Sequence, residues 1–239
     1  MLIQENKHNN STFSFVLLVI LLVVGTIMSL QLSREKKDAE GFTNEETALL
    51  SSGDSVMYVL DVNDPDDEKI LRTKSLRLGA EALKSNEYNR LKAKLLATVK
   101  APEYGGVGIA APQIGVNRRV IAVQRVDKPG EPFEVYPDIQ IDTAFGNMTP
   151  GFEGCLSVPT KRGRVMRYPM VVISYRNPSD FSLCRDTVNG FSAIIFQHEC
   201  DHLDGVLYID KTDSIFIDQE WKAEYDAFAT QGKYLRSQR

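Results

Sequence analysis

Two of the chain's three histidines lie four residues apart, and a glutamate follows the first of them. These residues are His198, Glu199 and His202, in the sequence FQHECDH. Positions four apart lie on one face of an α-helix, so the two imidazoles could share one divalent ion. Glu199 would then be placed to take a proton from a water that the ion activates. The pattern therefore predicts a metal-binding helix.

The neighbouring residues predict that this helix is buried. Phe191, Ile194 and Ile195 fall on the same face as the two histidines, so the ligands would project toward an apolar interior. Exclusion of water there would strengthen the effect of the metal. Cys200 would face away from the imidazoles and serve as a small packing residue. Asp201 is either a solvated helix charge or an acceptor that orients a ligand histidine.

A catalytic metal commonly has three protein ligands and one free position. The remaining histidine, His8, precedes a long apolar run, which leaves two candidates for the third ligand. Cys155 lies in EGCLS, whereas Glu220 lies in EWKA, which is similar to the downstream glutamate motif of thermolysin-like zinc peptidases. Phe216, Glu220 and Glu224 also follow one another at the spacing of an exposed amphipathic helix, which favours Cys155 as the ligand.

Three segments resemble, in order and spacing, the three signature motifs of peptide deformylases. They are GVGIAAPQ (106–113), EGCLSVP (153–159) and QHECDHL (197–203). The resemblance covers roughly residues 56–211, and the three motifs together are highly specific. It implies an α+β fold in which mostly antiparallel strands surround a central metal-binding helix. It also implies a hydrolase of N-terminal methionine processing in protein biosynthesis, which removes the formyl group from N-formylmethionyl peptides and releases formate.

The resemblance also implies roles for individual residues. Cys155, His198 and His202 would bind one Fe(2+), with Zn(2+) or Ni(2+) as alternatives, because thiolate and imidazole ligands suit all three metals. Glu199 would pass the proton that it accepts from water to the departing amine.

The motifs imply contacts to the substrate as well. The side-chain amide of Gln113 and the backbone N–H of Leu156 would donate hydrogen bonds to the oxyanion. Gly108 would let the peptide backbone approach closely, although simple turn geometry would also explain it. Ile109 stands where leucine is usual, a near-neutral change in volume, and is expected to bind substrate with Gly108.

Glu153 of the cysteine motif and Arg162, which follows that motif, are expected to support the metal loop. We expect Arg162 to be a buried partner of Glu153, the alternative being a solvated arginine in the sequence KRGR.

Two other functions remain open: a zinc endopeptidase that uses Glu220, and a module that binds peptide termini without turnover. Retention of Cys155, His198, Glu199, His202 and Gln113 argues against the module.

Residues 13–30 are almost uninterruptedly apolar. The run approaches the length that about 30 Å of hydrocarbon requires, and it exceeds the apolar core of about 7–15 residues in a secretory signal. We expect an uncleaved transmembrane anchor, with a cleaved signal peptide as the alternative. The chain then divides into a short polar N-terminus (1–12), the anchor (13–30), a polar tether (31–55) and a catalytic domain (56–239).

Charges bear on location and partners. Lys and Arg are more frequent after the apolar run, at Arg34, Lys36 and Lys37, than before it, and positive flanks tend to stay cytoplasmic. We therefore expect a cytoplasmic catalytic domain near ribosomes, with a periplasmic or exported domain as the alternative. The net charge of −4, with both signs interspersed, argues against a nucleic-acid partner.

Local patterns predict strands followed by helices, which indicates the α+β class without reference to any family. The three cysteines are a poor disulfide framework, although a Cys184–Cys200 bridge stays open. The expected helices are 44–50, 76–100, 190–203 and 213–230, the expected strands are 58–62, 119–126, 166–175 and 181–188, and residues 63–67 are expected to form a turn.

Overall fold

The structure, a computed structural model, describes residues 15–26, 28–29 and 40–230. The chain forms two compact units, Met1–Glu40 and Gly41–Arg239. In the first unit, residues 15–26 and 28–29 are helical, and their large apolar side chains are exposed. The rest of the predicted anchor (13–30) lies outside the described residues. Within the described ranges, no helix is both long enough and apolar enough to cross a membrane.

The second unit contains three antiparallel sheets of three strands each, in the orders β1-β2-β3, β4-β7-β8 and β5-β6-β9. The α+β class predicted from the sequence is confirmed. The strands are β1 (Gly108–Ala110), β2 (Val120–Gln124), β3 (Phe133–Pro137), β4 (Gln140–Phe145), β5 (Thr149–Cys155), β6 (Val158–Arg167), β7 (Met170–Arg176), β8 (Leu183–Asn189) and β9 (Ile215–Ile217).

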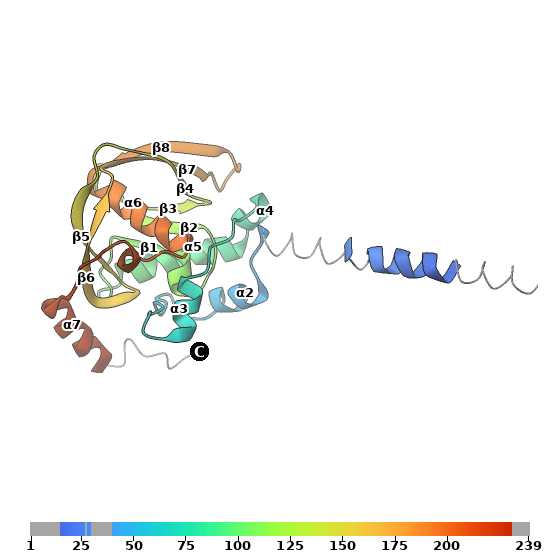
Figure 1. The fold of residues 1–239 in the computed structure, drawn as a ribbon, viewed down its shortest axis with the longest axis horizontal. Helices are drawn as coiled ribbons and strands as arrows, with labels where there is room; N and C mark the ends of the chain where they lie inside the picture. Colours follow the sequence, from blue (N-terminus) through green and yellow to red (C-terminus); the bar gives the residue numbers. More distant parts are fainter. Residues whose placement is uncertain (1–14, 27, 30–39, 231–239) are drawn as a thin grey trace, which may run out of the picture. The chain divides into compact units, whose positions relative to one another are not determined.

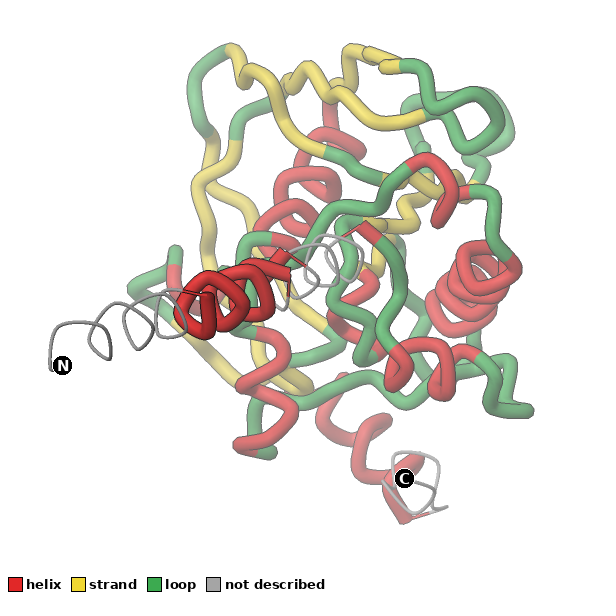
Figure 2. Tube along the Cα trace, turned by 90° about the vertical axis from the view of Figure 1, so that its right-hand side faces the viewer, coloured by secondary structure: helices red, strands yellow, loops and turns green. Residues whose placement is uncertain are grey.

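Helix α6 (Gly190–Leu203) lies in the middle of this unit and packs against β1, β2 and β8 (Figure 1). In the view of Figure 2, the strands gather toward the top and left of the folded unit. The other helices are α2 (Asn44–Leu50), α3 (Pro65–Leu71), α4 (Ala80–Leu83), α5 (Asn86–Lys100) and α7 (Gln219–Thr230), with 3-10 turns η1 (Ala111–Ile114) and η2 (Tyr208–Asp210).

The buried side chains form separate clusters on the two sides of the sheet β1-β2-β3. One cluster contains Leu91 and Leu95 of α5, which recur at helical spacing and pack against Ile109. The other contains Ile195 and Phe196 of α6. Because β2 is covered on both faces, its sequence VIAVQ is an apolar run with no alternation. Helix α6 therefore packs against the sheet β1-β2-β3, whose strand β1 carries part of the first motif.

The start of the folded unit differs from the prediction. Residues 41–55, assigned to the tether, belong to it, because Leu50 is buried and Glu46 pairs with the buried Arg118. Residues 58–61 belong to no helix or strand and Val62 lies in a turn, although the N–H groups of Leu60 and Val62 donate to the carbonyls of Gln113 and Ser157. The predicted turn at 63–67 is instead the capped beginning of α3.

Other boundaries differ for local reasons. The predicted helix over 76–100 is divided, since Ser85 accepts from the N–H of Tyr88 and starts α5 as a new helix. The predicted strand over 166–175 turns at Tyr168 and Pro169, between β6 and β7. The predicted helix over 213–230 begins with β9, which pairs with β6, and only then continues as α7. The three cysteines are free thiols, so no Cys184–Cys200 bridge forms.

Candidate metal centre

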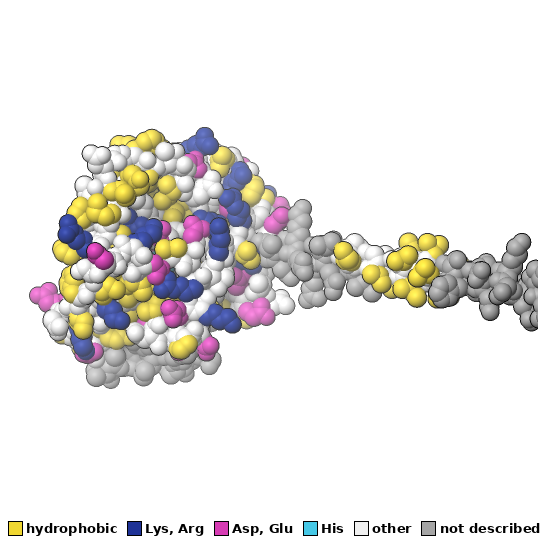
Figure 3. Space-filling view, viewed as in Figure 1, with side chains coloured by type: hydrophobic (Ala, Val, Ile, Leu, Met, Phe, Trp, Pro, Cys, Tyr) yellow, Lys and Arg dark blue, Asp and Glu magenta, His cyan; other side chains and the backbone are white. Residues whose placement is uncertain are grey.

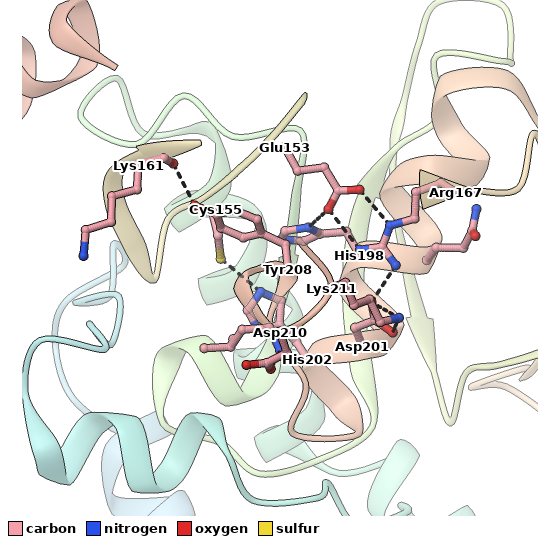
Figure 4. Close-up of polar contacts among 12 residues, drawn as sticks. Glu153, Cys155, Lys161, Arg167, His198, Asp201, His202, Tyr208, Asp210 and Lys211 are labelled. Carbon is pink, nitrogen blue, oxygen red and sulfur yellow. Dashed lines mark hydrogen bonds and ion pairs between the residues drawn. The ribbon is translucent and has the colours of Figure 1, made fainter. Parts of the chain in front are cut away.

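Three ligand atoms from two distant parts of the chain converge at α6. Cys155, His198 and His202 offer one ligand atom each, and these atoms lie within 4.8 Å of one another. The Sγ of Cys155 is 3.1 Å from the Nε2 of His202 (Figure 4). Ligands about 2.0–2.3 Å from one ion lie about 3–4 Å apart, so this separation suits a shared metal. The predicted ligand set is therefore brought together.

The hairpin of β5 and β6 aims the thiol at the helix. Its register shifts between Gly154 and Cys155, and Cys155 then pairs with Val158. Such an irregularity re-aims a side chain relative to regular alternation. The thiol is buried, and so is the His202 side chain on the facing helix.

Glu153 orients one of the two imidazoles. Its Oε2 lies 2.8 Å from the Nδ1 of His198, and its carboxylate also accepts two hydrogen bonds from Arg167, at 2.7 and 2.9 Å (Figure 4). A ligand histidine whose other ring nitrogen meets a carboxylate has a fixed orientation. The contacts place Glu153 between His198 and Arg167, where the predicted support of the metal loop is geometrically possible.

The prediction that Arg162 is the buried partner of Glu153 was wrong. Arg162 pairs instead with Asp218, at 2.6 Å, whereas Arg167 is the buried partner. Residues of a strand alternate between two faces, and over residues 161–167 of β6 the buried positions are Gly163, Val165 and Arg167. Arg162 belongs to the opposite face. The alternation places Arg167 on the same face as Gly163 and Val165, but the sequence alone does not say which face of β6 is buried.

Asp201 has a more distant role than predicted. It accepts hydrogen bonds from Arg167 at 2.6 Å and from Lys211 at 2.7 Å, and neither contact involves an imidazole. Since Arg167 also holds Glu153, Asp201 supports the ligand histidine through two intermediate side chains. Cys200 is buried in the apolar cluster behind the helix, as predicted.

The electrostatics of the site favour a cation. Burial lowers the pKa of His198, but hydrogen bonds with Cys155 and Glu153 outweigh it and raise that pKa well above its usual range. Burial lowers the pKa of His202 well below its usual range, which leaves a neutral imidazole with a free lone pair. A cysteine sulfur and two imidazoles, in surroundings that favour positive charge at His198 and keep His202 neutral, together fit a divalent ion with nitrogen and sulfur ligands.

Glu199 is buried beside the ligands and only partly satisfied. Its side chain is almost inaccessible, and its Oε2 has no hydrogen-bond partner among the described residues. Burial raises the pKa of this carboxyl to about 7. A carboxyl with such a pKa can both accept and release a proton near neutrality, which is the requirement for a general acid–base group.

Gln113 reaches the metal site from the 3-10 turn η1. Its Oε1 accepts the N–H of Ala110 at 2.8 Å, so its NH2 group must point the other way. That group lies 3.2 Å from the Oγ of Ser157 and 3.6 Å from the Sγ of Cys155. The amide is therefore held as a donor toward the ligands, as the oxyanion role requires.

A cavity of about 470 Å³ opens beside the ligands. Its wall contains Gly108, Gln113 and Leu156, three of the residues for which contacts to the substrate are predicted. The side chain of Ile109 is instead fully buried in the α5 cluster, because successive residues of β1 point to opposite faces, so only its backbone could contact a substrate. The wall also includes residues that the sequence did not single out, namely Tyr104, Phe152 and Trp221.

Glu220 also lies in the cavity wall, but outside the group of metal ligands. The position that it would fill in a thermolysin-like site is taken by Cys155. The structure therefore assigns the third ligand to the cysteine and gives no support to a zinc endopeptidase.

The ion pair of Glu153 makes stability depend on pH. Burial alone would raise the pKa of this carboxyl, but its hydrogen bonds with Arg167 and His198 lower it to about 2, from 4.5. A lowered pKa stabilises the fold fully above about pH 4.5, and this stabilisation disappears as the pH falls toward 2. The shift corresponds to about 3 kcal/mol of unfolding free energy.

Denaturant titrations of the metal-free protein between pH 7 and pH 2.5 measure this effect. We expect Glu153→Gln to be the less stable protein at pH 7 and the difference from the parent to shrink toward pH 2.5. Parallel stability curves for the two proteins would show that Glu153 is not held as an ion.

Comparisons with known proteins agree with this geometry. The sequence model of the family described as "Polypeptide deformylase" matches residues 58–216. A peptide deformylase of Leptospira biflexa is 34% identical over 168 residues, which cover 67% of this chain and 89% of that protein. One from Natranaerobius thermophilus is 35% identical over 159 residues, covering 65% of this chain and 94% of that protein.

Solved structures share the fold. A Met-Ala-Ser-bound class I type b peptide deformylase from Acinetobacter baumannii superposes with a TM-score of 0.58 at 34% identity, covering 65% of this chain and 98% of that one. A peptide deformylase from Synechococcus elongatus in complex with actinonin gives a TM-score of 0.59 at 25% identity, covering 79% and 94%. The similarity includes the segments that carry the ligand set and Gln113.

Proposed function

The chain belongs to the polypeptide deformylase family and carries a Cys–His–His metal site, and from this premise we propose that it hydrolyses the formyl amide of N-formylmethionyl peptides and releases formate. The observation that carries the proposal is the convergence of Cys155 with His198 and His202 beside a buried, half-satisfied Glu199. A metal, a proton acceptor and an open cavity are the minimum that amide hydrolysis requires.

We propose that the peptide lies extended along β1. This strand pairs with β2 on one side and forms an edge of its sheet in the described structure. Gly108 of β1 borders the cavity beside Glu199. An open edge can pair with the main chain of an extended peptide. The Acinetobacter baumannii relative, solved with Met-Ala-Ser bound, supports a peptide of this kind as occupant.

The metal would be held by Cys155, His198 and His202, and we propose Fe(2+), with Zn(2+) or Ni(2+) as alternatives. When bound, such an ion supplies a Lewis acid and an activated water at neutral pH. The chain's own contribution is the thiolate and the two imidazoles, one of them oriented by Glu153.

Glu199 is proposed to move the proton. Its carboxylate accepts the proton of the attacking water and later gives it to the amine that leaves when the formyl C–N bond breaks. The pKa of about 7, raised by burial, matches a group that alternates between the two states. The formyl oxygen would meet the Nε2 of Gln113 and the backbone N–H of Leu156, two donors that stabilise the developing negative charge.

The direct test is formate release from formyl-Met-Ala by the full chain, purified without oxygen and loaded with Fe(2+). We expect formate in stoichiometric amount with free Met-Ala, together with one metal per chain. Glu220→Gln is expected to keep that metal, because Glu220 is not a ligand. Loss of metal in Glu220→Gln together with casein cleavage would support a peptidase, and peptide binding without formate would support a binding module.

A methyl group added at Gly108 should disturb the proton acceptor. A Cβ there would lie 2.5 Å from the Oε1 of Glu199 and 2.7 Å from the Cγ2 of Ile195. Since a misplacement of about 1 Å can cost about 10²-fold in rate, Gly108→Ala should reduce kcat for formate release by about 10- to 100-fold. Gly151→Ala is the matched control, because no atom lies within 4 Å of its added Cβ. Equal kcat values for both variants would contradict the contact.

We also propose that residues 13–30 anchor the chain in a membrane with the catalytic unit in the cytoplasm. Support comes from the apolar sequence and from the exposed apolar side chains of residues 15–24. The full chain should then remain with membranes after a high-salt wash, and Val19→Arg/Leu22→Arg should release it. Digestion of the catalytic unit by protease added to intact spheroplasts would place it outside the cytoplasm instead.

A further inference from the structure

We propose that helix α7 makes this site select N-formyl peptides that carry a cationic side chain after their first residue. The inference rests on the proposed deformylase function and deepens it. Helix α7 begins beyond residue 216, where the family match ends, so its contribution is separate from the motifs that identify the family.

The cavity that α7 borders is a place for a ligand on independent grounds. It contains Cys155, His198 and Glu199 in its wall. The Glu199 carboxyl is 4% exposed, and its Oε2 has no hydrogen-bond partner in the described structure. A buried acceptor of this kind needs a partner from outside the protein. Substrate that reaches Glu199 must therefore pass the other residues of this wall.

The outer part of the wall has an excess of negative charge. Glu103, Glu220 and Glu224 line it, and its arginine, Arg162, is already paired with Asp218. The exposed Glu220 and Glu224 form no ion pair with a described residue. They lie four residues apart, so both point from the same face of α7. The face of the molecule drawn in Figure 3 mixes both signs of charge with apolar side chains.

Contacts at its first turn fix α7 against the β5–β6 hairpin. The Oδ1 of Asp218 accepts the N–H of Trp221 at 3.0 Å, and its Oδ2 accepts the Nε–H of Arg162 at 2.6 Å. The Trp221 ring packs over Gly154, where an added Cβ would lie 3.0 Å from it. The guanidinium of Arg162 is 5.8 Å from the ring centroid. Because these contacts fix the first turn of α7, Glu220 and Glu224 are held at the cavity wall.

A cationic side chain at the second or third residue of the peptide would meet this negative wall. Single exposed ion pairs contribute little, so we expect about a three- to tenfold gain in kcat/KM over a neutral peptide. An acidic side chain should be disfavoured by a similar factor. Both effects should weaken as salt shortens the range of the interaction.

Formate release from two peptide series tests the proposal with the Fe(2+)-loaded full chain. The series are formyl-Met-Ala-Xaa and formyl-Met-Xaa-Ala, with Lys, Gln or Glu as Xaa, at low and high salt. The comparison variant is Glu220→Gln/Glu224→Gln. The matched control is Glu81→Gln/Glu87→Gln, which makes the same change in net charge on α4 and α5, outside the cavity wall.

The expected result is a preference in the order Lys, Gln, Glu in at least one series, retained in the control and lost in the α7 variant. Equal kcat/KM values for all peptides would overturn the inference while the deformylase function stands. A preference that survives in the α7 variant would overturn the assignment to these glutamates. Absence of formate from every peptide would overturn the function and the inference together.

Discussion

Replacement of Glu199 by glutamine is expected to lower kcat/KM for formate release by about 10²–10⁴-fold, the range that general acid–base catalysis contributes. The amide keeps the shape of the carboxyl but cannot accept the water's proton. Because Glu199 is not one of the three residues whose ligand atoms converge, the variant should keep one metal per chain. Metal analysis beside the rate measurement separates loss of the proton acceptor from loss of the ion.

The same substitution should stabilise the metal-free protein. Burial raises the pKa of Glu199 to about 7, from 4.5, so the folded state disfavours the ionised carboxyl. The resulting loss of stability is absent below about pH 4.5 and complete above about pH 7, and it amounts to about 3 kcal/mol. Glu199→Gln should therefore resist denaturant better than the parent at pH 8 and equally at pH 4. Full formate release by Glu199→Gln would refute the catalytic role of Glu199.

Much of the centre could be predicted because its chemistry is local in the sequence. His198, Glu199 and His202 need only one helical turn to come together, and α6 has the bounds that the sequence indicates. Cys155 and Gln113 are distant from that helix, and composition alone left Glu220 open as a ligand. Periodicity favoured Cys155 over Glu220, and the family resemblance then decided for Cys155 and identified Gln113.

The parts that could not be predicted depend on contacts between distant segments. The partner of Glu153 follows from which face of β6 is buried, and that face is set by packing against η2. Strand β9 looks helical in isolation and is a strand because β6 offers it an edge. The start of the domain at residue 41 depends on the ion pair between Glu46 and Arg118, which are far apart in the sequence.

Replacement of Cys155 by alanine is expected to abolish stable metal binding, and with it formate release. The thiolate is the one anionic member of the three-ligand set, and two neutral imidazoles alone leave a divalent ion weakly held. Loss of a group that only supports a ligand typically costs about 10–100-fold in metal affinity, so loss of a ligand should cost more. We expect dialysed Cys155→Ala to retain little metal, measured by elemental analysis.

Cys200→Ala is the matched control, because Cys200 is equally buried, lies on the same helix as the histidines and packs into the apolar cluster behind them. It should keep one metal per chain and the parent's kcat. Cobalt substitution gives a second readout: a thiolate ligand produces an intense near-ultraviolet charge-transfer band, which should be present in Cys200→Ala and absent in Cys155→Ala. A full complement of metal in Cys155→Ala would mean that the sulfur near His202 is not a ligand, and the coordination derived from the fold would then be wrong.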